Sequence, residues 1–346
     1  MSPPIRQRGV ALLTVMVVVF LATVAAVALA RIQTFTLQRS TVLLHQQQAL
    51  HYARGGESWA ARILIRDRED GQRDHLEEDW AQLPPALPIE GGYLQGSLED
   101  LQGRYNLNNL LLAQAGDPDP EAPPTDDQSP QEGQPTEDQP PPQEQQEERD
   151  PQKEQIEILT RLLEQLELDP AIAQALADWL DPDQEPRFPD GAEDGEYLGR
   201  DPPYPAANRL LTSVSELRLI KGVDAESFDK LSPYVTALPV FTAVNVNTAQ
   251  APVLSALVEG LDLMRSEALV EARPPDGYES TRDFLDAIQV ADSPLTRDNL
   301  VLGSDYFLLR VEAVVGEGRA NLTSILARPP EGAIRILLRR FGNQLP

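Results

Sequence analysis

The sequence predicts an α+β protein in which a long N-terminal helix packs on an antiparallel β-sheet. A large all-α domain, made of two small helical units, is expected to interrupt the sheet in the chain. Three observations predict this class: a 21-residue uncharged run that continues as an amphipathic helix, several helical apolar stripes between residues 108 and 300, and alternating apolar residues near the C-terminus. The elements are justified below in chain order.

The first segment is a short basic leader, residues 1–9, followed by the apolar run from Val10 to Ala30. At about 1.5 Å per residue the run matches a hydrocarbon core of about 30 Å, so it predicts one transmembrane helix over residues 10–30. Arg6 and Arg8 place the N-terminus in the cytoplasm by the positive-inside rule. An uncleaved signal anchor and a cleaved signal peptide are the alternatives.

The residues around Gly9 favour a cut before the apolar run, which leaves Val10 as the first residue of the mature chain. The run from Arg8 to Val15 resembles a type IV prepilin leader, which a prepilin peptidase cleaves after the glycine before methylating the new amine. Most pilins carry a glutamate where this chain has Thr14. A subunit without that carboxylate suits a position with no subunit above it, because a buried carboxylate needs a positive partner.

Residues 31–107 are expected to continue the helix and to supply the first strands. Apolar residues recur at helical spacing from Arg31 to Arg66, and the pair Gly55-Gly56 is a possible bend. The segment from Tyr93 to Leu107 alternates around glycine-containing breaks, which indicates strand, turn and strand.

Residues 108–300 are expected to form the inserted α-domain. Helical stripes begin at Ile156, Pro170 and Ala225, and Ser213 with Glu216 has capping-box spacing. The turn Asn106-Leu-Asn108 recurs as Asn245-Val-Asn247, which indicates two related helical units whose asparagines can cap helices. Residues 117–150 contain 12 acidic residues among 34, with almost no apolar ones, so we predict a disordered acidic linker there.

Residues 301–346 are expected to form the rest of the sheet. Every second residue from Phe307 to Val315 is apolar, Gly316-Glu317-Gly318 turns the chain, and Arg319 to Ala327 returns as a strand. Ala333 to Phe341 makes a third strand. The pattern predicts an antiparallel meander with one face packed on the N-terminal helix.

Composition limits the function. The net charge of −26 argues against nucleic-acid binding, and the absence of cysteine excludes disulfides and thiol chemistry. The three histidines lie in the first quarter of the chain, which leaves little for general-base catalysis, so no catalytic residue is assigned and the chain is not expected to be an enzyme. A periplasmic hydrolase is a weak alternative, since only the density of carboxylates favours it.

A membrane-anchored DNA receptor is the second alternative. The segment Asn245 to Ala249, followed by a helix, resembles the entry to a helix-hairpin-helix module. From Val253 to Val270, however, Arg265 is the only cation, so phosphate contacts would be poor.

One acidic loop carries a candidate metal site. Carboxylates at alternate positions in a Pro- and Gly-bearing loop suit a hard cation that takes six to eight oxygen ligands, which favours Ca²⁺. The loop is not an EF-hand, and a solvated acidic loop is the alternative. We expect Asp181, Asp183, Glu193 and Asp194 to bind the ion. The weaker candidates are Asp178, Glu185 and Asp190.

Several segments resemble the type II secretion system protein K family, the large minor pseudopilins. They are Gly103–Leu110, Asp178–Asp181 with Gly191–Asp194, Ser215–Arg218 and Val244–Ala249. The resemblance covers the chain except the acidic linker, and the missing glutamate is itself a feature of this type. It implies a pilin-like fold with an inserted α-domain that binds calcium, and a place at the tip of the pseudopilus, whose assembly the subunit helps to initiate. It also implies I-type and J-type minor pseudopilin partners and single-pass anchoring in the inner membrane, with most of the chain in the periplasm.

Overall fold

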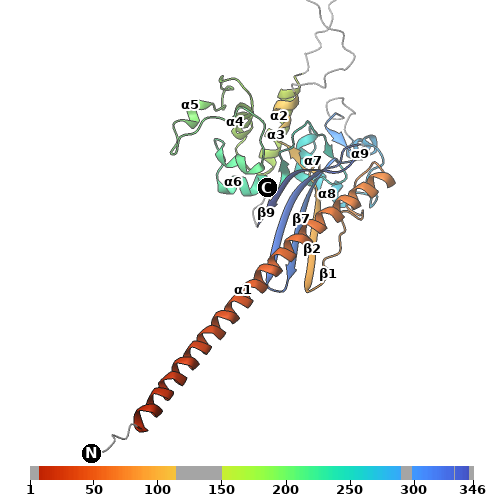
Figure 1. The fold of residues 1–346 in the computed structure, drawn as a ribbon. Coiled ribbons are helices and arrows are strands. Elements are labelled where there is room, and N and C mark those ends of the chain that lie inside the picture. The colour runs from red at the N-terminus through yellow and green to blue at the C-terminus, as the bar shows by residue number, and fades with distance from the viewer. Residues whose placement is uncertain (1–7, 114–149, 290–297, 331, 343–346) are drawn as a thin grey trace, which may run out of the picture.

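The structure is a computed structural model that describes residues 8–113, 150–289, 298–330 and 332–342. Helix α1 runs without interruption from Arg8 to Asp70 and projects from the rest of the molecule as a long rod (Figure 1). The predicted helix is confirmed, and the expected bend at Gly55-Gly56 is absent from α1. Gly56 instead lets the helix approach the sheet closely, because a Cβ there would lie 3.1 Å from Val311 Cγ1.

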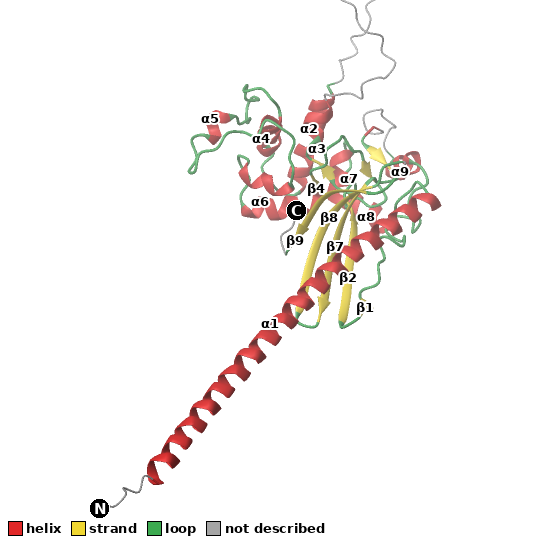
Figure 2. Cartoon of the chain, viewed as in Figure 1, coloured by secondary structure: helices red, strands yellow, loops and turns green. Residues whose placement is uncertain are grey.

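The sheet has five antiparallel strands in the order β1-β2-β7-β8-β9 (Figure 2). The first two are β1 (Leu87–Ile89) and β2 (Gly92–Asp100). The other three are β7 (Tyr306–Val315), β8 (Gly318–Ala327) and β9 (Arg335–Phe341), so the predicted C-terminal meander is confirmed. Strand β2 pairs with β7 from Gly92–Val315 to Asp100–Phe307. Residues 101–305, which separate the two strands in the chain, therefore start and end at the same end of the sheet.

The C-terminal half of α1 covers one face of the sheet. Ala49, Ala53, Ala60 and Leu64 lie on one face of the helix and are fully buried against apolar residues of β7 and β8 such as Phe307 and Leu322. The small alanines allow close approach of helix and strands, and burial of the apolar surface stabilises the packing. The apolar positions nearer the N-terminus of α1, including Phe35 and Leu43, are exposed in this single chain.

Between β2 and β7 the chain forms a mostly helical insertion at the end of the head farthest from the N-terminus (Figure 1). The α-helices are α2 (Asn109–Leu112), α3 (Pro151–Gln165), α4 (Ala171–Leu180), α5 (Asp194–Tyr197), α6 (Ala225–Leu231), α7 (Ala251–Leu257), α8 (Leu263–Glu271) and α9 (Thr281–Ile288). The 3₁₀ helices are η2 (Val214–Leu219) and η3 (Ser232–Tyr234).

The insertion also contains two pairs of short parallel strands, which the sequence did not predict. Strand β3 (Tyr105–Asn106) pairs with β4 (Val235–Thr236), and β5 (Val244–Asn245) pairs with β6 (Leu300–Val301). Each pair brings the start of one helical unit next to its end. The unit starting at β3 and the unit starting at β5 therefore close in the same way.

The two Asn-x-Asn turns have matching hydrogen bonds. Asn106 Oδ1 accepts from the Asn108 backbone N–H at 3.2 Å, and Asn245 Oδ1 accepts from that of Asn247 at 2.9 Å. The second asparagine of each turn accepts from a distant backbone N–H, that of Leu211 for Asn108 and that of Tyr278 for Asn247. The internal repeat is thus structural. The predicted helix capping is wrong for Asn108, whose side chain makes no cap bond to α2.

Two predicted helix starts differ in detail. Helix α3 begins before Ile156, because Asp150 accepts from the backbone N–H groups of Gln152 and Lys153. Ser213 caps η2, but Glu216 bonds to Thr212 and so does not complete the predicted capping box. The predicted acidic linker lies outside the described residues except for Asp150.

Candidate metal site and domain junction

The acidic loop follows α4 and is fastened to its last turn. Asp178 is fully buried, and its Oδ2 accepts from the backbone N–H groups of Arg187 at 3.1 Å and Ala192 at 2.8 Å. Gly191 passes so close that a Cβ there would lie 2.2 Å from Asp178 Oδ2. Only glycine fits this position without displacing the loop. Asp178 therefore sets the path of the loop.

Three of the predicted ligands converge. Oxygens of Asp181, Asp183 and Glu193 all lie within 4.8 Å of one another. Glu193 is only 6% exposed, and Asp181 is 4% exposed. Among the described residues, neither carboxylate oxygen of Glu193 nor Oδ1 of Asp181 has a hydrogen-bond partner. A buried carboxylate oxygen without a partner is costly, so this geometry fits an ion that coordinates oxygen.

The electrostatics of the loop point the same way. Burial, together with the charges of Asp178, Asp181, Asp183 and Asp194, raises the pKa of Glu193 to about 7. Burial also raises the pKa of Asp178 and of Asp181, and Arg187 opposes the rise in both. A divalent cation would remove the repulsion and favour the ionised forms. The donor set is entirely oxygen, which suits Ca²⁺ better than the softer metals.

The remaining predicted ligands have other roles. Asp194 begins α5, and its Oδ1 accepts from the Ala206 backbone N–H at 2.8 Å. Glu185 is exposed, and its backbone N–H donates to Asp183 Oδ1 at 2.9 Å. The backbone N–H of Asp190 donates to Gln174 at 3.0 Å. None of these side chains belongs to the three-carboxylate group.

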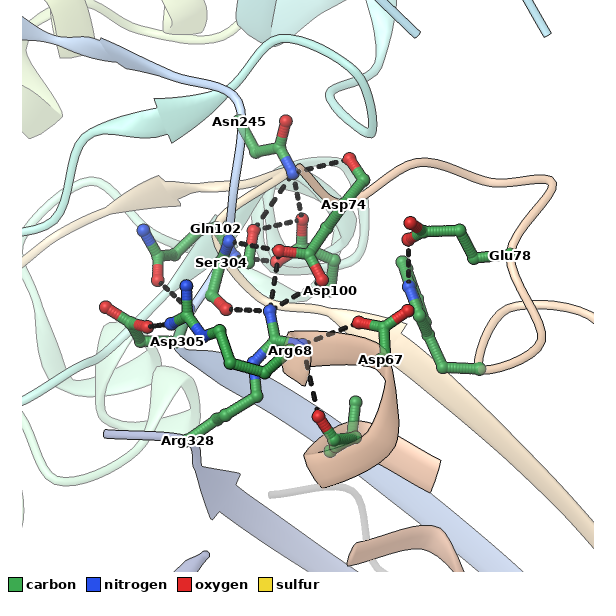
Figure 3. A network of polar contacts seen from close by, with 12 residues as sticks. Asp67, Arg68, Asp74, Glu78, Asp100, Gln102, Asn245, Ser304, Asp305 and Arg328 are labelled. Atoms are coloured by element: carbon green, nitrogen blue, oxygen red, sulfur yellow. Dashed lines mark hydrogen bonds and ion pairs between the residues drawn. The ribbon is translucent and has the colours of Figure 1, made fainter. Parts of the chain in front are cut away.

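A second polar centre, which the sequence did not reveal, joins the insertion to the sheet and to the end of α1 (Figure 3). Arg328, at the end of β8, is 2% exposed. Its Nη2 lies 2.6 Å from both carboxylate oxygens of Asp74 and donates to the Ser304 carbonyl at 2.6 Å. Its Nη1 lies 2.6 Å from Asp67 Oδ2 in the last turns of α1.

Asp100, the last residue of β2, extends this junction into the insertion. Its Oδ2 accepts from Asn245 Nδ2 at 3.1 Å, Thr248 Oγ1 at 2.5 Å and Ser304 Oγ at 2.6 Å. Asn245 also donates to the Asp74 carbonyl at 3.1 Å. Burial raises the pKa of Asp100 to about 6, although the hydroxyl donors oppose the rise.

The junction explains the structural role of Asn245, the first asparagine of the second Asn-x-Asn turn. Asn245 ends a two-residue strand and ties the insertion to Asp100 at the end of β2 and to Ser304, two residues before β7. The repeated Asn-x-Asn pattern was the one available signal for it. Asp67, Asp74 and Arg328 gave no signal, because they are distant in sequence and lie in unremarkable local patterns.

The predicted processing residues Gly9 and Val10 lie in the first turn of α1. Among the described residues, one helix, within α1, is long and apolar enough to cross a membrane by length and composition. Helix α7 follows the second Asn-x-Asn turn, and every one of its residues from Val253 to Leu257 is buried. Helix α7 is therefore a core element and a poor phosphate-binding surface, which removes support from the DNA-receptor alternative.

Comparison with known proteins gives a consistent result. Two family models described as type II secretion system protein K match residues 103–240 and 244–302. The chain is 36% identical to type II secretion system protein K of Pseudomonas aeruginosa over 97% of this chain and 93% of that protein. It is 34% identical to the protein of the same name from Klebsiella pneumoniae, over 97% of each chain.

A solved structure agrees in fold. It is a chain of the GspK–GspI–GspJ complex of the enterotoxigenic Escherichia coli type 2 secretion system. It matches with a TM-score of 0.68 and 29% identity, over 88% of this chain and 100% of that one. The chain belongs to the type II secretion system protein K family.

Proposed function

We propose that this chain is the minor pseudopilin at the tip of the periplasmic pseudopilus, and that it helps to initiate pseudopilus assembly. The observation that carries the proposal is the position of the insertion. It occupies the end of the head opposite the projecting part of α1 (Figure 1), where a further subunit of a helical filament would stack. A subunit with this bulk above its sheet terminates a filament more readily than it extends one.

Thr14 supports the same position. It stands where most pilins carry a glutamate, so this subunit offers no carboxylate to a terminal amine of a subunit above it. The partners proposed are the I-type and J-type minor pseudopilins, since the solved relative was obtained in a GspK–GspI–GspJ complex. In this role the chain is a structural subunit and has no catalytic residue.

Labelling of assembled pseudopili tests the tip position. Gold-labelled antibodies against an epitope tag in the insertion should mark one end of each filament. Labels distributed along the filament would argue for a shaft position. A tag on the major subunit serves as the control for antibody access.

Anchoring follows from α1. The basic leader lies in the cytoplasm, the apolar part of α1 crosses the inner membrane once, and the head lies in the periplasm. We propose that a prepilin peptidase cleaves after Gly9 and that Val10 becomes the methylated first residue. Intact-mass measurement on membrane-purified protein should give a mass that begins at Val10, and retention of Met1 would contradict the proposal.

We further propose that Asp181, Asp183 and Glu193 bind Ca²⁺. The support is their convergence and the unpartnered buried oxygens described above. Ca²⁺ at about 100 times its Kd would add about 2.7 kcal/mol to the free energy of unfolding. The full chain in detergent should therefore melt several degrees higher with Ca²⁺ than with EGTA. Asp181→Ala with Asp183→Ala should abolish the difference.

The control for the calcium measurement is Asp276→Ala, which removes an exposed carboxylate outside the loop. It should keep the full response to Ca²⁺. Equal melting temperatures of the unsubstituted protein in Ca²⁺ and in EGTA would contradict the calcium site and favour the alternative of a solvated acidic loop. Mg²⁺ should substitute poorly, because it requires a tight octahedron and gives up water reluctantly.

A further inference from the structure

Arg187 is a cation already built into the acidic loop. Its Nη2 lies 2.8 Å from Asp181 Oδ2 and donates to Gln152 Oε1 on α3 at 3.0 Å. Its Nε lies 3.2 Å from Asp178 Oδ1. Its backbone also holds the loop, since its carbonyl accepts from the Gly191 N–H at 2.8 Å. One guanidinium thus bridges α3, the end of α4 and the loop.

The guanidinium serves only one side of the acidic group. It contacts Asp178 and one oxygen of Asp181, which form the inner side against α4. The other side consists of Asp183, Glu193 and Asp181 Oδ1, and among the described residues neither Asp181 Oδ1 nor either carboxylate oxygen of Glu193 has a hydrogen-bond partner. Asp181 belongs to both sides. Its two oxygens face two different positive charges when an ion is bound.

We propose that Arg187 antagonises Ca²⁺ at this loop: it holds the loop closed without metal and weakens metal binding by sharing the carboxylate of Asp181. This inference rests on the calcium site proposed above and names what sets its affinity. Two cations that neutralise the same carboxylates bind with negative coupling, and the coupling is reciprocal. Arg187 therefore contributes more to the metal-free protein than to the metal-bound one.

Arg187→Gln tests the antagonism because it removes the charge and keeps a hydrogen-bonding side chain. A unit charge about 6 Å from a divalent ion, even screened as in water, changes its binding roughly tenfold. Calorimetric titration of the full chain in detergent with CaCl₂ should therefore give a Kd about tenfold lower for Arg187→Gln than for the unsubstituted protein.

Thermal melting supplies a second readout. In EGTA, Arg187→Gln should melt several degrees below the unsubstituted protein, because its acidic group has lost its counter-ion. In saturating Ca²⁺ the gap should narrow, since the metal replaces the lost charge. A purely structural arginine would lower both melting temperatures equally, and that result would overturn the inference.

Two further variants sharpen the test. Arg187→Lys retains the charge and should keep a Kd close to that of the unsubstituted protein; a Kd as low as that of Arg187→Gln would show that charge is not the cause. The matched control is Arg200→Gln in the same part of the insertion, where Arg200 stacks over Tyr197 at 4.9 Å. It should leave the Kd unchanged.

The outcomes separate the two proposals. If the unsubstituted protein gives no heat with CaCl₂ and no change in melting, the calcium site itself is wrong. If it binds Ca²⁺ and Arg187→Gln binds equally or more weakly, the site stands and the antagonism is wrong.

Discussion

At the scale of single residues, Arg328 is the charge on which the junction depends. It neutralises Asp74, which is 1% exposed, and Asp67 at the end of α1. Replacing a buried arginine and keeping its carboxylate partner leaves an uncompensated charge. Arg68, the other arginine of this centre, pairs with Asp305 and so offers no substitute.

Arg328→Met should therefore lower the free energy of unfolding by about 3–5 kcal/mol. Denaturant unfolding in detergent, followed by tryptophan fluorescence, measures it. The matched control is Arg66→Met, because Arg66 pairs with Asp79 on the surface, where the side chains are 61% and 83% exposed. That change should cost less than about 1 kcal/mol. Equal losses for both variants would show that the junction is not fixed by its charge.

Asp100 makes the same junction sensitive to pH. Its pKa in the folded protein is about 6, raised from 3.8 by burial. Between these values the folded state binds more protons than the unfolded state, so the contribution to stability is full below about pH 4 and is lost as the pH rises to 6. The loss amounts to roughly 3 kcal/mol.

Asp100→Asn removes this titration. The stability of the unsubstituted protein relative to Asp100→Asn should fall by roughly 3 kcal/mol between pH 4 and pH 7. Urea unfolding at several pH values measures the difference. A difference that stays constant with pH, or that grows towards neutrality, would contradict the burial of an unneutralised carboxyl at this position.

The sequence indicated which carboxylates converge where these residues are neighbours in the chain, and their binding of an ion stays a prediction. Asp181 and Asp183 share one loop with Glu193, so alternation of acids was enough to indicate convergence. Asp194 lies outside the three-carboxylate group, and its Oδ1 accepts from the Ala206 backbone N–H, so its part in binding an ion stays a prediction. Arg328 and Asp74 are brought together only by the fold, so no local pattern could indicate them.

At the scale of elements, periodicity was sufficient for the long ones. Strand β7 buries alternate residues over most of its length, and α1 buries residues at helical spacing, so both patterns could be recognised. Strands of two residues, such as β3 and β5, are too short to show a period. The bend expected at Gly55-Gly56 was wrong because the glycine there serves helix–sheet contact.

The two adjacent glycines of α1 should respond oppositely to substitution. Gly55 has no atom within 4 Å of a Cβ position, whereas a Cβ on Gly56 would meet Val311 and Leu94 at 3.1 and 3.3 Å. Gly55→Ala should raise the free energy of unfolding by about 0.5–1 kcal/mol, because alanine favours the helix.

Gly56→Leu should lower the free energy of unfolding by about 1–3 kcal/mol, because the side chain overpacks the contact with the sheet. Thermal melting of both variants measures the two signs. A loss of stability in Gly55→Ala would indicate that the helix needs freedom at this pair after all.

At the scale of the whole molecule, α1 is one continuous helix, so its apolar N-terminal part continues into the head without a break. Two hydrogen bonds fix the rotation of the head about the α1 axis. His45 Nδ1 accepts from the Glu317 N–H at 3.3 Å, and Gln46 donates to the Arg319 carbonyl at 2.7 Å. The number of residues between the apolar N-terminal part of α1 and these contacts therefore sets the direction in which the head faces around the helix axis.

An insertion in α1 after Ser40 tests that angular coupling. Two alanines would turn the head by about 200° and raise it by about 3 Å, whereas seven would turn it by about 700°, almost two full revolutions, and raise it by about 10 Å. If this direction governs how the head meets its neighbours, secretion by a complemented null strain should be lost with two alanines and largely retained with seven. Retained secretion with two alanines and lost secretion with seven would mean that the height of the head above the membrane matters, and not the direction in which it faces around the helix axis.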